Sequence, residues 1–201
     1  MADDPLIADN ASACEQLHGI AALWLVHDRD INWPLDDSVV RIVAGRPMLL
    51  RMARGYAPQS VALAAPATPV LALGGQLQSG IAVTLGNRVV VGPYIGDLPS
   101  PRARRRFHRH VDGLCALHGV RPASVARDEH PDYYTSQVAD TQARAVVPVQ
   151  HHLAHVLACV ADNAIAGPVL GVAFDGTGYA SDGTVWGGEF LHVEGTTVQR
   201  V

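Results

Sequence analysis

The pattern of apolar and polar positions is most regular in the last third of the chain. Residues 153–161 form an alanine-rich apolar run of helical length, which predicts a helix. The continuous apolar run at residues 169–174 predicts a buried strand. Asp182 and Gly183 form a tight-turn signal, and residues 184–193 predict a second strand. The pattern therefore predicts a helix followed by a β-hairpin.

Short strands alternate with helices in the middle of the chain. Apolar runs predict strands at residues 70–73, 81–85, 88–91 and 146–149, with one more ending near residue 126. Ser100 and Pro101 predict the start of a helix, because serine caps the first turn and proline fits the first helical position. A second helix is predicted after Pro131. This order resembles the ribonuclease-H-like lobe of actin and sugar kinases, and it predicts an α/β fold.

The N-terminal third has a less regular pattern. It predicts a helix at residues 11–17, a strand at residues 22–26, a second apolar run at residues 39–43 and a short helix at residues 47–52. Residues 64–69, rich in alanine and proline, form the best linker in the chain. We therefore expect a separate α+β segment before the α/β lobe.

Composition narrows the class of protein. Apolar residues make up 48% and charged residues 17% of the chain, which is typical of a globular protein with a sizeable core. The net charge of −4 gives no general attraction to nucleic acid. The longest uncharged stretch, residues 60–81, is interrupted by proline and glycine, so no membrane span is expected. Three distant cysteines and an N-terminus without a signal-peptide pattern favour a cytoplasmic location.

The arginine-rich run at residues 102–110 is a separate feature of the charge pattern. It contains one aromatic residue, and no second basic stripe accompanies it, which argues against nucleic-acid binding. The run predicts a solvated or partner-facing helix.

Two histidines and an aspartate are the best candidates for metal ligands. His151 and His155 are four residues apart, so on a helix their imidazoles leave the same face and can share one ion. Asp175 follows the strand predicted at residues 169–174. Small residues come next, and their amides can cradle a phosphate: Gly176, Thr177 and Gly178. His152 points elsewhere and is predicted to support the pair or to lie on the surface. Ordinary helices and hairpins also contain such residues, and that alternative stays open.

A second candidate site is an arginine-rich stretch at residues 36–54. Arginine forks suit phosphate and carboxylate oxygens, and a neighbouring serine can add a donor. The candidate residues are Ser38, Arg41, Arg51 and Arg54. The alternative interpretation is a set of surface ion pairs.

Several short motifs follow one another along nearly the whole chain. They are residues 36–41, 44–47, 51–58, 71–75, 95–98, 130–133, 149–155, 172–179 and 182–190. The most specific are VQHHLAH at residues 149–155 and VAFDGTGY at residues 172–179. Together the motifs resemble HypF, the carbamoyltransferase family of nickel–iron hydrogenase maturation. The resemblance implies that residues 1–65 are the C-terminal portion of a YrdC-like domain. Residues 66–201 would then be the N-terminal portion of a Kae-like carbamoyltransferase domain.

The resemblance implies a specific reaction. HypF-like proteins hydrolyse carbamoyl phosphate to carbamate, form carbamoyl-adenylate with ATP, and pass the carbamoyl group to the C-terminal cysteine of HypE. A divalent metal, iron or zinc, is expected near the nucleotide to polarise the carbamoyl carbonyl, and Mg²⁺ can accompany the ATP. His151, His155 and Asp175 match the ligand positions of the motif, and the resemblance makes the same three residues catalytic.

The resemblance also assigns residues that would hold the nucleotide. In the glycine-rich hairpin they are Gly176, Thr177, Gly178, Asp182, Gly183, Gly187, Gly188 and Glu189. In the YrdC-like part they are Ser38, Arg41, Arg51 and Arg54, where carbamoyl-adenylate would form.

The sequence also departs from the family pattern. It lacks the acylphosphatase-like segment, the paired cysteines of the zinc fingers and the first half of the YrdC-like domain, so a fragment or a shortened relative is expected. Residues 75–79 replace the family's Glu-Leu-Lys-Asn and lose two charges at an expected phosphate contact. Two alternatives stay open. One is a noncatalytic relative that binds a metal or the acceptor protein, and the other is a metabolite or tRNA carbamoyltransferase of the same superfamily.

Overall fold

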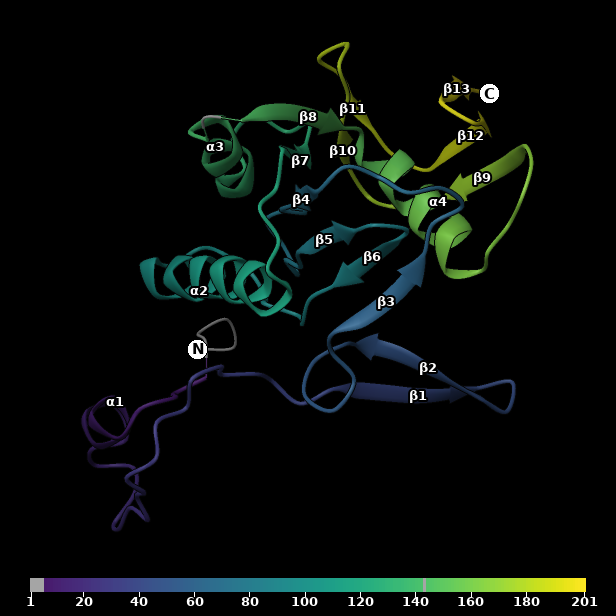
Figure 1. Cartoon of the computed structure of the whole chain (residues 1–201). Coiled ribbons are helices and arrows are strands. Elements are labelled where there is room, and N and C mark those ends of the chain that lie inside the picture. Colours follow the sequence, from purple (N-terminus) through teal and green to yellow (C-terminus); the bar gives the residue numbers. More distant parts are fainter. Residues whose placement is uncertain (1–5, 143) are drawn as a thin grey trace.

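The computed structural model describes residues 6–142 and 144–201 as a mixed α/β fold (Figure 1), which confirms the predicted class. Its largest sheet has the strand order β3-β6-β5-β4-β7-β8. The strands are β3 (Gln59–Ala62), β4 (Val70–Ala72), β5 (Ala82–Leu85), β6 (Arg88–Val91), β7 (Ser124–Asp128) and β8 (Ala145–Val149). β4, β7 and β8 run parallel, and the remaining neighbours are antiparallel.

The strand β3 has no counterpart among the predicted elements, because four residues are too few to show a clear alternation. It pairs with β6, and Val61 lies opposite Val89. The sheet therefore includes residues from both sides of the linker predicted at residues 64–69. The domain boundary placed there stays a prediction.

The helix α2 (Pro101–His118) covers the sheet and supplies much of its core. As predicted, Ser100 caps the helix, since its Oγ accepts a hydrogen bond from the Ala103 N–H at 3.2 Å. Phe107 and Leu114 are fully buried. Truncating such a side chain to alanine costs about 2–5 kcal/mol. The core residues around them are Leu71, Leu73, Ile81, Val83, Val90, Ile95, Leu98, Ala103, Val125 and Ala139.

A smaller sheet packs on the last helix. After α3 (Tyr134–Asp140) the chain forms α4 (His151–Asp162), as the apolar run predicted. The sheet order is β13-β12-β9, with β9 (Val169–Ala173), β12 (Glu189–Glu194) and β13 (Thr197–Arg200). Val156 of α4 packs against Leu191 and Val193. A Cβ at Gly171 would lie 2.4 Å from the Val156 side chain, so glycine lets helix and strand approach.

The single return strand predicted at residues 184–193 is wrong. The chain forms β11 (Val185–Trp186), interrupted at Gly187 and Gly188, and then β12. β11 pairs with β10 (Gly178–Tyr179), whereas β12 pairs with β9. The predicted burial of β9 is also only partly correct, because Leu170 is largely exposed.

The N-terminal third contains α1 (Asn10–Gln16) and a hairpin of β1 (Val39–Val43) and β2 (Arg46–Arg51). The helix predicted at residues 47–52 is wrong, because Ala44 and Gly45 both have positive φ and turn the chain back into an antiparallel pair. The strand predicted at residues 22–26 is also wrong: in the described chain this segment pairs with no strand.

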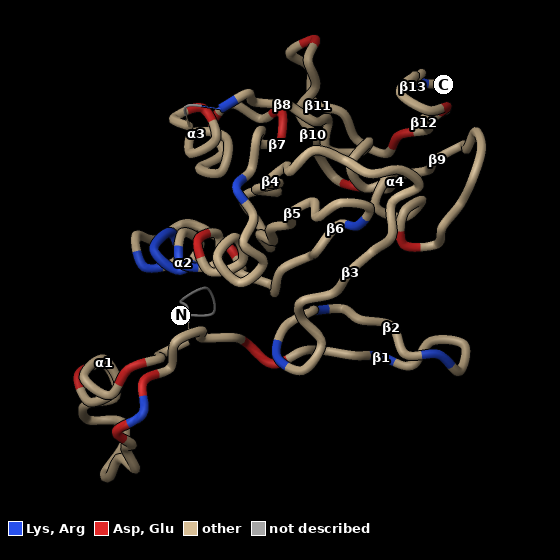
Figure 2. The backbone as a smooth tube through the Cα atoms, viewed as in Figure 1, with Lys and Arg blue, Asp and Glu red and all other residues tan. Residues whose placement is uncertain are grey.

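The arginine-rich part of α2 faces the chain's own N-terminal segment, and Figure 2 shows this basic stretch beside it. Arg106 is 7% exposed and pairs with Asp36 at 2.5 Å. Arg102 donates a hydrogen bond to the Leu6 carbonyl oxygen at 3.0 Å. The prediction of a solvated or partner-facing helix is therefore wrong for these two arginines, which bind within the chain. Across the part of the chain that is described, no helix is both long and apolar enough to cross a membrane.

Candidate functional site

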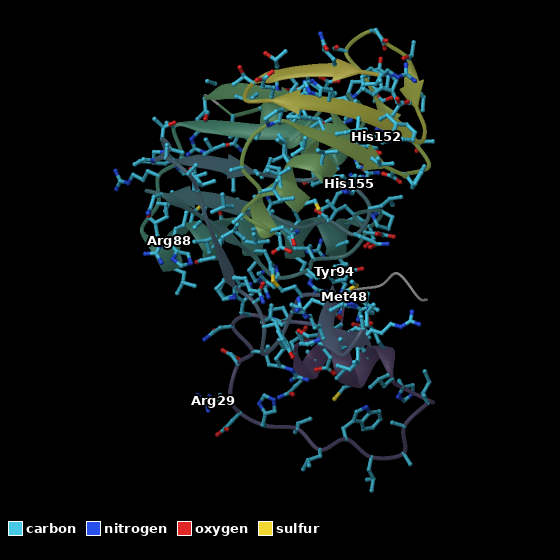
Figure 3. All side chains as sticks on the ribbon, turned by 90° about the vertical axis from the view of Figure 1, so that its right-hand side faces the viewer. Arg29, Met48, Arg88, Tyr94, His152 and His155 are labelled. Carbon is cyan, nitrogen blue, oxygen red and sulfur yellow. The ribbon has the colours of Figure 1, made fainter. Side chains whose placement is uncertain are left out.

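The candidate site is a cleft of about 770 Å³ between the two sheets. The cleft is lined by Gly75, Gln76, Leu77, Gln78, Tyr133, His151, His155, Val172, Ala173, Phe174, Asp175 and Thr177. The loop that follows β4 contributes one wall, and the start of α4 with the end of β9 contributes the other. Figure 3 labels His152 and His155 on α4, well apart from Met48 of β2.

The start of α4 fixes the direction of the histidines. The Gln150 side-chain oxygen caps the helix by accepting a hydrogen bond from the Leu153 N–H at 2.9 Å. Its Nε2 lies 3.1 Å from Nδ1 of His152, which is fully buried. His152 is therefore a buried side chain that packs beneath the site, and of its two predicted positions the surface one is wrong. His151 and His155 leave the helix toward the cleft, one turn apart.

Three side-chain atoms converge at the edge of the cleft. His151 Nε2 lies 2.8 Å from Asp175 Oδ2, and His155 Nε2 lies 3.3 Å from the same oxygen. The two Nε2 atoms are 3.3 Å apart. A tetrahedral metal with bonds of about 2.0–2.1 Å places its ligand atoms about 3.3 Å from one another. Two sides of the triangle match this spacing and the third, at 2.8 Å, is shorter. The donor set of two imidazoles and a carboxylate suits iron or zinc.

The charges around the triangle favour ionised groups. A hydrogen bond between His151 Nδ1 and Asp128 Oδ2, 2.6 Å apart, is the main cause that raises the pKa of His151 against the effect of burial. Burial alone would raise the pKa of Asp175. The Gly176 N–H and the two histidines outweigh that effect and lower the pKa. The two carboxylates beside His151 thus favour its protonated form, and an ion that binds Nε2 would have to replace any proton there.

The glycine-rich hairpin divides into a part at the cleft and a part away from it. The Gly176 N–H donates to Asp175 Oδ1 at 2.7 Å, and Thr177 lines the cleft. A Cβ at Gly178 would lie 2.5 Å from the His152 ring, so only glycine fits there. Asp182 Oδ1 accepts from the Thr184 N–H at 2.9 Å and so closes the turn.

Thr177 is the one predicted nucleotide-holding residue of the described hairpin that lines the cleft. The others do not line it: Gly176, Gly178, Asp182, Gly183, Gly187, Gly188 and Glu189. Glu189 is buried and accepts two hydrogen bonds from Arg200, at 2.6 and 2.7 Å, so its carboxylate is already satisfied within the chain.

The predicted residues of the N-terminal third lie apart from the histidine cleft. Arg54 forms a salt bridge with Asp37, and the Ser38 hydroxyl donates to the Arg54 carbonyl oxygen at 2.9 Å. The Arg51 guanidinium lies over the ring of Tyr94, 5.0 Å from its centroid. Arg41 is exposed on β1, and none of the predicted residues of this group lines the cleft around α4. Their assignment to a nucleotide pocket stays a prediction.

Two residues that the motifs did not single out contribute to the site, Gln76 in the cleft lining and Asp128 behind His151. Asp128 ends β7, next to β8, whose end leads directly into α4. Because parallel strands bring their C-terminal ends to one edge, this position was open to prediction from the strand order. Gln76 was noted only as a departure from the family, yet its Oε1 accepts the first N–H of α3, from Tyr134, at 2.6 Å.

Sequence comparisons give one family. Residues 65–162 match the model described as the HypF Kae1-like domain, and residues 171–201 match the second subdomain of the carbamoyltransferase Kae1-like domain. The chain is 44% identical over 203 residues to carbamoyltransferase HypF of Synechocystis sp., covering 100% of this chain and 26% of that relative. It is 43% identical over 197 residues to carbamoyltransferase HypF of Rhizobium leguminosarum bv. viciae, covering 98% and 26%.

Structural comparisons agree. A crystal structure of full-length HypF in a phosphate- and nucleotide-bound form superposes with a TM-score of 0.93 at 36% identity, covering 100% of this chain and 32% of that one. The T. kodakarensis HypF crystal structure gives 0.89 at 30% identity, covering 98% and 26%. The chain spans about a quarter of the length of the curated relatives it matches. The matching sequence models, the identity to HypF relatives and the structural match together show that this chain belongs to the HypF family. Residues 65–162 and 171–201 form its Kae1-like region.

Proposed function

We propose that this chain carries part of the transferase site of a HypF-type carbamoyltransferase, with His151, His155 and Asp175 as ligands of a divalent iron or zinc ion. The observation that supports it most directly is the triangle of two Nε2 atoms and one carboxylate oxygen, with sides of 2.8, 3.3 and 3.3 Å, at the edge of a wide cleft. A bound ion supplies Lewis-acid polarisation of a carbamoyl carbonyl.

The chain's own residues set how a substrate would lie. Thr177, which lines the cleft just after β9, can donate to phosphate oxygens. Tyr133 offers an aromatic face on the opposite wall, where it stacks on His130 at 4.2 Å between ring centroids. A related full-length HypF crystallises in a phosphate- and nucleotide-bound form, which supports nucleotide binding as part of the proposal.

The proposed reaction follows the family. Carbamoyl phosphate is hydrolysed to carbamate and phosphate, and carbamate and ATP give carbamoyl-adenylate and pyrophosphate. The cysteine thiolate at the C-terminus of a HypE-like acceptor in the cytoplasm then takes the carbamoyl group and releases AMP. Names of relatives support the carbamoyl transfer. ATP, with Mg²⁺ on its phosphates, and the acceptor protein are parts of the proposal, and so are the nucleotide-contacting roles of Ser38, Arg41, Arg51 and Arg54.

Metal content tests the site. We expect the purified chain to bind iron or zinc, and the variants His151→Ala, His155→Ala and Asp175→Asn to lose it, because each removes one of three ligands. The control is His18→Ala, which removes an exposed histidine of the N-terminal segment. Unchanged metal content in all three variants would remove the site from the proposal.

Catalysis needs its own measurement. We expect carbamoyl-phosphate-dependent exchange of pyrophosphate into ATP, because carbamoyl-adenylate formation is reversible. A complete chain that binds metal through the three ligands but supports no exchange would be a noncatalytic relative. The metal assay and the exchange assay together thus separate the enzyme from the binding protein.

A further inference from the structure

Asp128 is the buried carboxylate that holds His151 from behind. Its side chain is 6% exposed, and its Oδ2 lies 2.6 Å from His151 Nδ1. Its other oxygen, Oδ1, accepts a hydrogen bond from the His130 N–H at 2.8 Å. Both carboxylate oxygens are therefore used, and each faces one fixed partner.

This arrangement decides which nitrogen of His151 carries the proton. A carboxylate at Nδ1 stabilises the Nδ1–H tautomer, which leaves the lone pair of Nε2 free. Nε2 is the atom that faces Asp175 and His155. We propose that Asp128 is a positioning residue that fixes the tautomer and the ring orientation of His151, so that Nε2 can bind a metal ion. The inference rests on the proposed function of His151 as a ligand.

Asp175 is the competing acceptor for the proton, since it lies 2.8 Å from Nε2. Asp128 has the shorter contact and is far more buried than Asp175. A charge-assisted hydrogen bond is stronger where water is excluded, so the proton at Nδ1 is the one that is retained. Asp175 stays available as a ligand.

The two histidines therefore differ in how they are held. His155 is 59% exposed, and in the described chain its hydrogen-bonding contacts lie at Nε2, toward His151 and Asp175. His151 is fixed from both ends. The structure thus predicts one preorganised ligand and one adaptable ligand, and Asp128 is the source of the difference.

The substitution Asp128→Asn tests this inference because it keeps the shape of the side chain. The Asn oxygen would stay on the His130 N–H, since the amide nitrogen cannot accept that bond. The amide nitrogen then faces His151 Nδ1 and donates to it, which favours the Nε2–H tautomer. We expect the affinity for Zn²⁺, measured by competition with a chelator, to fall about 10–100-fold.

The matched control is Asp140→Asn. Asp140→Asn removes the same charge as Asp128→Asn. Asp140 pairs with Arg127, the neighbour of Asp128, at 2.9 Å and does not contact a histidine of the site. Its Zn²⁺ affinity should equal that of the wild type. In the metal-free chain, ¹⁵N resonances of a neutral His151 should show the Nδ1–H tautomer in the wild type and the Nε2–H tautomer in Asp128→Asn. A merely structural role of Asp128 would not exchange the tautomers.

The outcomes separate the inference from the proposed function. If the wild type binds Zn²⁺, His151→Ala abolishes binding and Asp128→Asn leaves affinity and tautomer unchanged, Asp128 does not position the ligand, while the metal site stands. If neither the wild type nor His151→Ala binds Zn²⁺, both the proposed metal site and the proposed role of Asp128 are contradicted. Weaker binding with an exchanged tautomer supports both.

Discussion

The cleft beside α4 and the basic face of α2 both concentrate charged side chains, but they use them differently. At the cleft, His151, His155 and Asp175 converge on one another and line an open cavity. On α2, Arg106 is buried against Asp36, and Arg102 binds the N-terminal segment. Convergence onto an open cleft indicates a site, whereas satisfied charges indicate a structural contact. The number of charged residues in a stretch of sequence does not show whether they form a ligand site or a structural contact.

The largest effect that would sharpen this comparison is expected from Asp36→Ala. Arg106 is 7% exposed, so removing its partner leaves a buried cation, which costs about 3–5 kcal/mol of the free energy of unfolding. Denaturant unfolding measures this loss. Zn²⁺ affinity should not change in the folded fraction, because neither Arg106 nor Asp36 lines the cleft that holds the ligands. A loss of Zn²⁺ affinity without a loss of stability would contradict the structural role of this pair.

The next effect is a pH dependence that belongs to α2. Burial is the main cause that lowers the pKa of His110 from 6.5 to about 4, with Arg106 and Arg109 lowering it and Asp36 opposing. The unfolded chain binds a proton near pH 6.5 and the folded chain only near pH 4, so stability falls as the pH falls between these values. The full effect is about 3 kcal/mol.

The measurement compares unfolding of the wild type and His110→Leu from pH 7 to pH 4. Other titrating groups contribute equally to both proteins, so the difference between the two curves isolates His110. The wild type should lose more stability than the variant as the pH falls. Parallel curves would show that His110 accepts a proton in the folded chain as easily as in the unfolded one.

The sequence predicted the parts of this molecule that depend on local pattern. The capped helix α2, the strands β4 to β6 and the order of motifs leading to α4 and Asp175 all follow from residues close together in the chain. These are features that one segment decides largely by itself. The grouping of His151 with Asp175, which belong to two separate motifs, was instead expected from the resemblance to the HypF family.

Contacts between distant segments were not predictable in the same way. The strand β2 was predicted as a short helix at residues 47–52, because a short apolar run fits both periods, and the turn at Ala44 and Gly45 that pairs it with β1 was not predicted. The bond between Asp128 and His151 joins β7 to α4 across 23 positions, and only the parallel pairing of β7 with β8 brings them together. The burial of Arg106 depends on Asp36, 70 positions away.

The smallest effect on stability is expected for the exposed ion pair Arg54–Asp37, in contrast to the buried pair Arg106–Asp36. Arg54 is 69% exposed and pairs with an exposed Asp37. Such pairs contribute about 0–1 kcal/mol, so Arg54→Ala should change the unfolding free energy by no more than that. Zn²⁺ affinity should stay the same, because Arg54 does not line the cleft of α4.

ATP affinity decides how Arg54 is classified. Its guanidinium is held by one exposed carboxylate, so a phosphate can replace that partner at little cost in stability. If Arg54 serves the predicted nucleotide pocket, Arg54→Ala weakens ATP binding and Asp37→Ala does not, because a nucleotide contact needs the cation and not its partner. Equal ATP affinities in both variants would mean that Arg54, like Arg102 and Arg106 of α2, forms only contacts within the chain. The cleft at His151, His155 and Asp175 would then be the main candidate for nucleotide binding.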